Sequence, residues 1–194
     1  ERYEEHFRFD AMLGKTLAVY DEVLRSSPRA AQRPSREQVP RKSRVVHVVE
    51  SFGAGTAEVI GRLTRGMPEY QHVVVHGRRR EAASVNRDAL GPGVKMVEWR
   101  DAEREINVAR DPSALLHLLS ILRRLGRVDL IHAHGSKGGF HGRLAARQSG
   151  RHGRTVYTSH GSPILRRDVS PLLHKLYAAL EWLGRPYRLC RVDM

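Results

Sequence analysis

Residues 44–49 read RVVHVV and are followed directly by ESFGAGT at residues 50–56. Apart from Arg44 and His47, the first run consists of valines, which is typical of a buried strand in a parallel sheet. The two glycines predict a tight turn, and residues 55–66 have the apolar spacing of a helix. A strand, a glycine turn and a helix in this order indicate the first unit of an α/β fold.

The same alternation of strand and helix signals continues toward the C-terminus. Further strands are expected at 71–76 (QHVVVH), 94–98 (VKMVE), 128–132 (VDLIH) and 155–158 (TVYT). Further helices are expected at 115–125, after the start signal Asp111-Pro112-Ser113, and at 138–149 and 170–183. This order predicts an α/β fold, a Rossmann-like open parallel sheet with helices on both faces.

The residues before this alternation predict a separate helix and a linker. Residues 1–24 have apolar side chains at helical spacing, so we expect an amphipathic helix that needs a partner surface. Residues 25–43 are basic and rich in proline, which is typical of a solvated linker or of a basic arm for nucleic acid or anionic lipid. No aromatic residue interleaves with these charges, which favours the linker. The predicted organisation is therefore helix 1–24, linker 25–43, Rossmann-like domain 44–185 and tail 186–194.

Composition excludes several classes of protein. The chain has 194 residues, a formal net charge of +13 and one cysteine, Cys190. A single cysteine rules out an intrachain disulfide and any site built from several cysteines, and a reducing cytoplasm is the expected location. No apolar run approaches the 18 residues or so of a membrane span, whereas the basic charge suits peripheral binding at the anionic inner face of a membrane.

The carboxyl ends of parallel strands are where ligands bind in open α/β sheets, and the first such end carries Gly53-Ala54-Gly55. Glycines let a backbone approach a ligand closely, and the following helix presents free N–H groups to an anion. The same pattern also fits a plain tight turn. It is neither a P-loop nor a complete G-x-G-x-x-G motif, which argues against an NAD-dependent dehydrogenase.

Two later strand ends carry histidines. The segment 132–139 (HAHGSKGG) includes His134 and Lys137, and the segment 158–163 (TSHGSP) includes His160 and Gly161. His160 has either a hydrogen-bonding role in a cleft or a purely structural one. His132, His134 and His141 suggest zinc, but no carboxylate or cysteine at metal spacing completes a set, so we expect no metal.

Three stretches together resemble the N-terminal half of family 4 glycosyltransferases, which are GT-B enzymes. They are RVVHVVESFGAGTAEVIGRLTRGM, VDLIHAHGSKGGFHGRLAAR and VYTSHGSPILRRDVSPLLHKLYAALEWLG, within residues 43–185. The resemblance implies that Gly53 to Gly55 border the donor phosphate and sugar, although Ala54 here separates two glycines that are often adjacent in the family. It implies that His160 lies beside the transferred sugar and stabilises an oxocarbenium-like transition state by hydrogen bonding. It places His134, Lys137 and Gly161 on the acceptor side, and it implies no metal.

The resemblance also defines the expected function. In the family a second domain, marked by a Glu-x7-Glu signature, holds the nucleotide sugar, and residues 1–24 are similar to the family's final helix. We therefore expect a fragment or fusion that lacks the donor domain and is inactive alone. Its expected partners are a glycan or lipid-linked acceptor and a second chain that supplies the donor half, with no cofactor besides the nucleotide-sugar substrate.

The alternative is a basic binding module without catalysis, for nucleic acid or an anionic membrane. It rests on the net charge of +13. The chain offers neither aromatic platforms nor a recognition-helix motif, so no specific nucleic acid is expected.

Overall fold

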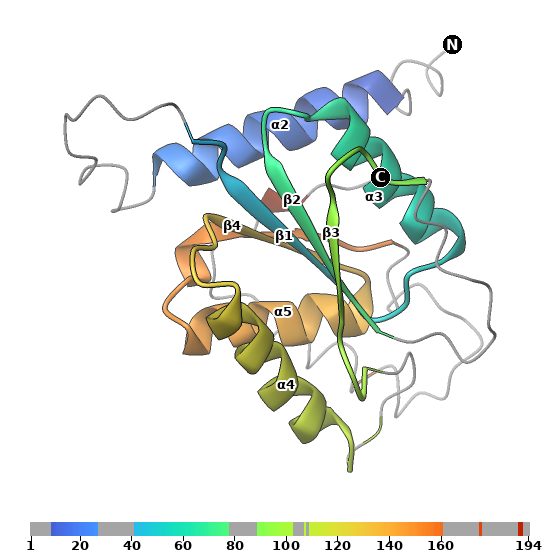
Figure 1. The fold of residues 1–194 in the computed structure, drawn as a ribbon, viewed down its shortest axis with the longest axis vertical. Helices are drawn as coiled ribbons and strands as arrows, with labels where there is room; N and C mark the ends of the chain where they lie inside the picture. The colour runs from blue at the N-terminus through green and yellow to red at the C-terminus, as the bar shows by residue number, and fades with distance from the viewer. Residues whose placement is uncertain are drawn as a thin grey trace.

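A computed structural model describes residues 9–26, 41–77, 89–102, 107, 109–160, 175 and 190–191 (Figure 1). The elements in chain order are α2 (Phe9–Arg25), β1 (Arg44–Val49), α3 (Ala54–Gly66), β2 (Gln71–His76), β3 (Lys95–Glu98), α4 (Asp111–Arg124), β4 (Leu130–His134), α5 (Ser136–Gln148), η2 (His152–Arg154), β5 (Thr155–Thr158) and β6 (Cys190–Arg191). None of the helices in these ranges is long and apolar enough to span a bilayer.

The strands form one sheet in the order β3-β2-β1-β4-β5-β6, and every pair of neighbours is parallel. This confirms the predicted Rossmann-like open parallel sheet. The chain first builds outward from β1 to β3 and then returns to the other side of β1 with β4. The carboxyl ends of β1 and β4 therefore flank the topological switch point, where open α/β sheets bind their ligands.

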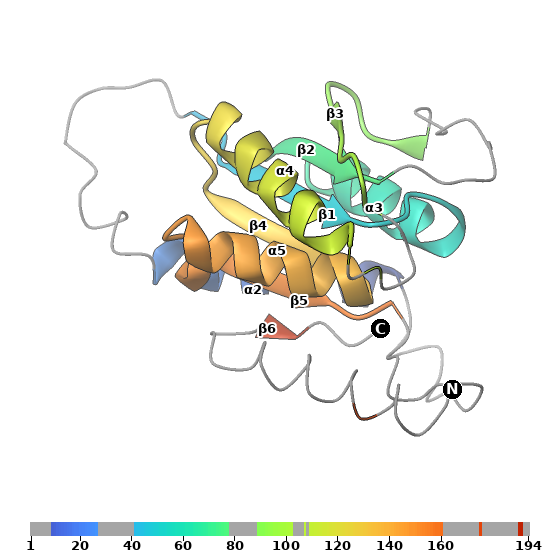
Figure 2. The same ribbon diagram turned by 90° about the horizontal axis from the view of Figure 1, so that it is seen from below.

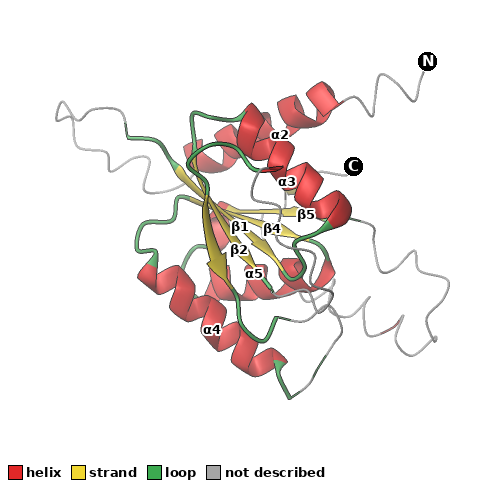
Figure 3. Cartoon of the chain, turned by 45° about the vertical axis from the view of Figure 1, so that its right-hand side comes forward, coloured by secondary structure: helices red, strands yellow, loops and turns green. Residues whose placement is uncertain are grey.

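Helices cover both faces of the sheet. Helices α4 and α5 lie on one face, and α2 and α3 lie on the other (Figures 2 and 3). Alternate residues of β1 serve the two faces, as the pleat of a strand requires. Val46 and Val48 belong to the cluster under α4 and α5, whereas Val45 packs with side chains of α2 and α3.

Helix α2 buries its apolar stripe against its own sheet. Tyr20 and Val23 are buried in a cluster that also contains Leu63 of α3 and Leu130 of β4. Helices α2 and α3 approach closely, since a Cβ atom at Gly66 would lie 2.7 Å from Cδ2 of Leu13. The surface on which the predicted amphipathic helix packs is therefore the face of the sheet that α3 also covers.

Several predicted boundaries were wrong. Strand β4 spans Leu130–His134, two residues later than predicted, because the carboxylate of Asp129 accepts a hydrogen bond from the Arg44 backbone N–H at 2.9 Å and the ladder with β1 starts at Leu130. Helix α4 starts at Asp111, four residues before the predicted 115. The predicted tail contains strand β6, which pairs with β5.

Other predictions lie outside the described residues. These are Gly161, most of the linker 25–43, residues 1–8 of the first helix and, apart from Lys175, the helix at 170–183.

Candidate functional site

The carboxyl edge of the sheet brings together the three segments singled out from the sequence. Glu50 follows β1, Gly135 follows β4, and His160 lies two residues after β5. The backbone N–H of Gly135 donates to the carbonyl of Thr158 at 2.9 Å, which ties the segment after β4 to the end of β5. These segments form one edge around the switch point.

The glycines after β4 leave space that the side chains of Glu50 and Tyr157 occupy. The Glu50 carboxylate accepts a hydrogen bond from the N–H of Gly138 at 2.9 Å, at the N-terminus of α5. A Cβ atom at Gly135 or Gly138 would lie 2.9 or 2.8 Å from a carboxylate oxygen of Glu50, and one at Gly139 would meet the ring of Tyr157. Glu50 thus supplies the negative charge that this helix end favours.

Glu50 was not among the predicted site residues, although its position as the acid between a buried strand and a glycine turn was a usable signal. Burial raises the pKa of its carboxyl, and the hydrogen bonds from backbone amides and the charge of Lys137 oppose that rise. The charged form of Glu50 is therefore stabilised by the backbone N–H groups that donate hydrogen bonds to it.

The N-terminus of α3 is open at Gly55, whereas that of α5 is filled by Glu50. Gly53 precedes the first helical residue of α3, and no side chain caps that helix end. A Cβ atom at Gly55 would meet nothing within 4 Å, and the first turn carries no acidic residue. The buried ring of Phe52 anchors the start of this turn in the core. The geometry fits the predicted phosphate role of the turn, which stays a prediction.

A layer of buried histidines lies under α2 and α3. His47 of β1, His72 of β2, and His132 and His134 of β4 are each at most 5% exposed. The register places His47 beside His132 across the ladder, and His134 beside Thr158. The alternation within β4 predicted that its two histidines share a face, whereas His47 and His72 were not among the predicted site residues.

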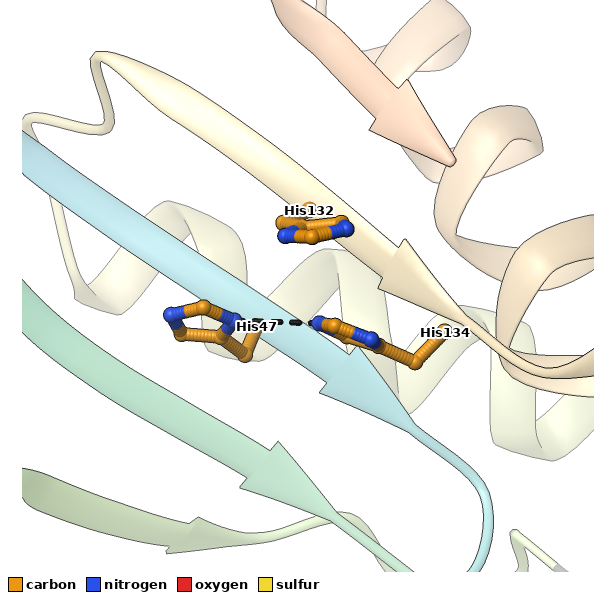
Figure 4. Close-up of side chains that lie close together, drawn as sticks. All are labelled: His47, His132 and His134. Carbon is orange, nitrogen blue, oxygen red and sulfur yellow. Dashed lines mark hydrogen bonds between the residues drawn. The ribbon is translucent and has the colours of Figure 1, made fainter. Parts of the chain in front are cut away.

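The histidines are hydrogen-bonded to one another and to their neighbours. Nδ1 of His47 lies 3.0 Å from Nε2 of His134 (Figure 4), and Nε2 of His47 lies 3.0 Å from Nδ1 of His72. His134 reaches the candidate catalytic residue directly, because its Nδ1 lies 2.8 Å from Nε2 of His160. His132 bonds the Tyr20 hydroxyl at 2.6 Å and the Thr158 hydroxyl at 2.7 Å instead.

Burial keeps these imidazoles uncharged. Desolvation lowers the pKa of His132 to about 3 and that of His160 to about 4. The pKa values of His47 and His134 are also well below the ordinary range, first because of burial and then because of the neighbouring histidines. At neutral pH each ring therefore carries one proton, with one donor and one acceptor nitrogen.

The structure places His134 and Lys137 beneath the surface of this edge. His134 is fully buried under His160, and Lys137 is 7% exposed with its ammonium 2.5 Å from a carboxylate oxygen of Asp111. Their predicted acceptor-side role stays a prediction.

The imidazoles of His47, His132 and His134 are the one candidate metal set among the described residues, with ligand atoms within 4.8 Å of one another. An ion at this position would have to break the hydrogen bonds that those nitrogens make. No cysteine or carboxylate of the described chain joins the set. Zinc binding would therefore cost these hydrogen bonds, and the expectation of no metal stays a prediction.

Comparison with known proteins supports the family relation. Residues 53–193 match Glycosyltransferase Family 4. A solved structure, UDP-N-acetylglucosamine 2-epimerase from Rickettsia bellii, is similar with a TM-score of 0.49 and 12% sequence identity; the match covers 72% of this chain and 37% of that one. No curated protein sequence matches the chain. Since the family match spans most of the sequence, the chain belongs to glycosyltransferase family 4.

Proposed function

We propose that this domain forms the acceptor-side half of an enzyme that transfers a hexosyl group from a nucleotide sugar to a glycan or lipid-linked acceptor. Such a reaction belongs to polysaccharide or glycolipid biosynthesis. The observation that carries the proposal is the position of His160 at the carboxyl edge of the sheet, with its Nε2 held 2.8 Å from Nδ1 of His134. Family membership supports the type of reaction.

His160 suits hydrogen bonding to a sugar better than nucleophilic or acid–base catalysis. Burial lowers its pKa to about 4, so the ring is neutral at physiological pH. Its contact with His134 fixes the position of the ring, and a preorganised group of this kind stabilises charge that develops in a transition state. The open N-terminus of α3 near Gly55 is suited to the donor phosphate.

We expect turnover to require the family's donor-binding domain. That domain, in the same polypeptide or in a partner chain, would hold the nucleotide sugar, while residues 1–194 contribute the acceptor side. The net charge of +13 suits an acceptor that is linked to lipid at an anionic cytoplasmic membrane face. No further cofactor is needed in this scheme.

The test is a transfer assay with residues 1–194, nucleotide sugars and glycan or lipid-linked acceptors, with and without an added family 4 donor domain. We expect transfer only with the donor domain. In the active assembly, His160→Ala should lower kcat about 100-fold, as removal of one transition-state hydrogen bond commonly does.

The matched control is His117→Ala, because His117 is a half-buried histidine of α4 that accepts a hydrogen bond from the backbone N–H of Arg100. It should leave kcat unchanged. An unchanged kcat in His160→Ala contradicts the role of this residue, and transfer by residues 1–194 alone contradicts the need for a donor domain. Oligonucleotide binding that weakens steeply with salt would favour the basic binding module instead.

A further inference from the structure

A continuous row of hydrogen bonds runs from a backbone carbonyl to His160. Nε2 of His72 lies 2.9 Å from the carbonyl oxygen of Met67. Each following contact joins one histidine to the next, from His72 to His47, from His47 to His134 and from His134 to His160, at 3.0, 3.0 and 2.8 Å. Every contact uses a different nitrogen of each ring. We call these four residues the histidine row.

The carbonyl gives the row a direction. A carbonyl oxygen accepts hydrogen bonds and cannot donate them, so Nε2 of His72 must carry a proton. In a neutral imidazole Nδ1 is then the acceptor, which requires a proton on Nε2 of His47. By the same reasoning Nε2 of His134 donates to Nδ1 of His47, and Nε2 of His160 donates to Nδ1 of His134. The position of the proton on each ring therefore follows from that on the ring before it.

We propose that the Met67 carbonyl, acting through His72, His47 and His134, fixes His160 as the tautomer with its proton on Nε2 and a lone pair on Nδ1. The three intervening histidines are positioning residues, since they act on substrate only through His160. Among the described residues Nδ1 of His160 has no hydrogen-bond partner, so it is the nitrogen left to recognise a ligand.

Neutrality of the row is a condition of this mechanism. One extra proton, entering at Nδ1 of His160, would shift along the row, reverse each bond between histidines and leave His72 with a proton on both nitrogens. Burial opposes that event, because desolvation lowers the pKa of each ring in the row. The neutral direction is therefore the one populated at physiological pH.

His132 lies beside the row and is not part of it. Its ring centroid is 3.9 Å from that of His134, yet its two nitrogens bond the hydroxyls of Tyr20 and Thr158. Hydroxyls donate or accept, so these contacts leave the tautomer of His132 open. The histidine row, in contrast, ends on a carbonyl oxygen that only accepts, and this gives it a defined direction.

The consequence concerns the ligand and rests on the proposed function. A lone pair on Nδ1 accepts a hydrogen bond from an O–H group, such as a sugar hydroxyl, and repels the oxygen of an ionised phosphate. The row thus selects a hydroxyl-bearing part of the substrate at His160. It places the charged phosphate elsewhere along the edge.

The first test is the protonation pattern itself, measured on residues 1–194 at pH 7 with 15N-labelled histidine. Long-range 1H–15N correlation spectra distinguish a protonated ring nitrogen from an unprotonated one. We expect all four rings of the row to be neutral with the proton on Nε2. A proton on Nδ1 of any of the four overturns the proposal, and it does so whether or not the domain takes part in sugar transfer.

The second test removes the anchor with His72→Phe, which keeps an aromatic ring at the position. Met67 O retains the N–H of Tyr70 as a donor at 3.2 Å. Nε2–H of His47 would then face a phenyl ring, and a buried N–H without a partner is costlier than an unpaired acceptor. The signals of His47, His134 and His160 should therefore shift to the Nδ1–H tautomer. Unchanged tautomers in the folded variant would show that His72 only fills space.

The matched control is Thr158→Val, an isosteric change beside the row that removes a partner of His132. It should alter the spectrum of His132 and leave the row on Nε2–H. If His72→Phe does not fold, the wild-type spectrum still decides the proposal. If Thr158→Val shifts His160 as much as His72→Phe does, the anchor is not the Met67 carbonyl.

Discussion

Both faces of the sheet bury apolar side chains, but the face under α2 and α3 also buries a layer of histidines. Under α4 and α5 the strands present valine and isoleucine to a cluster around Leu118, Leu122 and Trp99. Under α2 and α3 the same strands present His47, His132 and their neighbours. Within each of the strands β1 and β4, successive residues thus alternate between the two interiors.

The difference shows what each interior contributes. An aliphatic interior stabilises the fold in proportion to the apolar surface it buries and tolerates exchange among residues of similar volume. A buried polar layer adds stability only while every donor and acceptor is paired, and it then specifies one arrangement of side chains. The aliphatic face therefore supports the sheet, while the histidine face holds His160 in place at the edge.

The largest expected effect is the pH dependence of stability, to which the face under α2 and α3 contributes most of the histidines. The histidines with lowered pKa on the α2 and α3 side are His47, His72, His132, His134 and His160. Above about pH 6.5 they are neutral in both the folded and the unfolded chain, so they contribute no pH dependence. Below that pH the unfolded chain binds protons that the folded chain does not, and stability falls until the folded pKa values are reached, near 3 for His132 and near 4 for His160.

At pH 5, His132 and His160, whose pKa values lie near 3 and 4, should each lower the free energy of unfolding by about 2 kcal/mol relative to pH 7. Urea unfolding at several pH values measures the slope. His141, buried between α4 and α5 and also with a lowered pKa because of burial, provides the control. His141→Asn should therefore make the fall of stability with decreasing pH less steep. A free energy of unfolding that is constant between pH 7 and pH 5 contradicts this account.

On the aliphatic face the expected effect comes from lost volume. Leu118 is fully buried in the cluster of α4 and α5, so Leu118→Ala should lower the free energy of unfolding by about 3 kcal/mol. Leu116 lies two residues away on the same helix and is 68% exposed, so Leu116→Ala should change it by less than about 0.5 kcal/mol. Equal losses in the two variants would show that α4 does not pack as described. Neither variant should alter the pH slope.

A smaller effect is expected where α2 contacts the histidine face. Tyr20→Phe removes the hydroxyl that lies 2.6 Å from Nδ1 of His132 and should lower the free energy of unfolding by about 1 to 2 kcal/mol. Tyr70→Phe removes a less buried hydroxyl that donates to Asp21 at 3.1 Å, and it should lower the free energy of unfolding by a smaller amount. Thermal or urea unfolding of both variants gives the comparison. A larger loss for Tyr70→Phe would indicate that the Tyr20 hydroxyl is not part of the polar layer.

The smallest expected effect is that of zinc. A metal bound only by the folded chain raises Tm. Because the nitrogens of His47, His132 and His134 are already hydrogen-bonded, excess Zn²⁺ should leave Tm unchanged at pH 7. A rise in Tm that is lost in His47→Phe but kept in His117→Ala would show that the cluster binds metal after all.

Much of the fold could be predicted from local patterns. Strands β1, β2 and β5 have the predicted bounds, because strands buried on both faces are marked by β-branched apolar residues. The start of β4 could not be predicted in this way. Val128 is buried and apolar, yet the ladder begins at Leu130, and hydrogen bonding to β1 rather than hydropathy decides that boundary.

By itself the sequence determined the α/β class, the parallel sheet, the edge that carries the candidate site and the positions of the glycine turn, His134 and His160 along it. Those features depend on periodicity and on residues near in sequence. The tertiary structure alone decided that the Glu50 carboxylate packs against Gly135 and Gly138. It alone decided that His72 and His47 form a chain of hydrogen bonds to His134. Such contacts depend on which strands are neighbours and in what register, and that information lies in pairings between residues far apart along the chain.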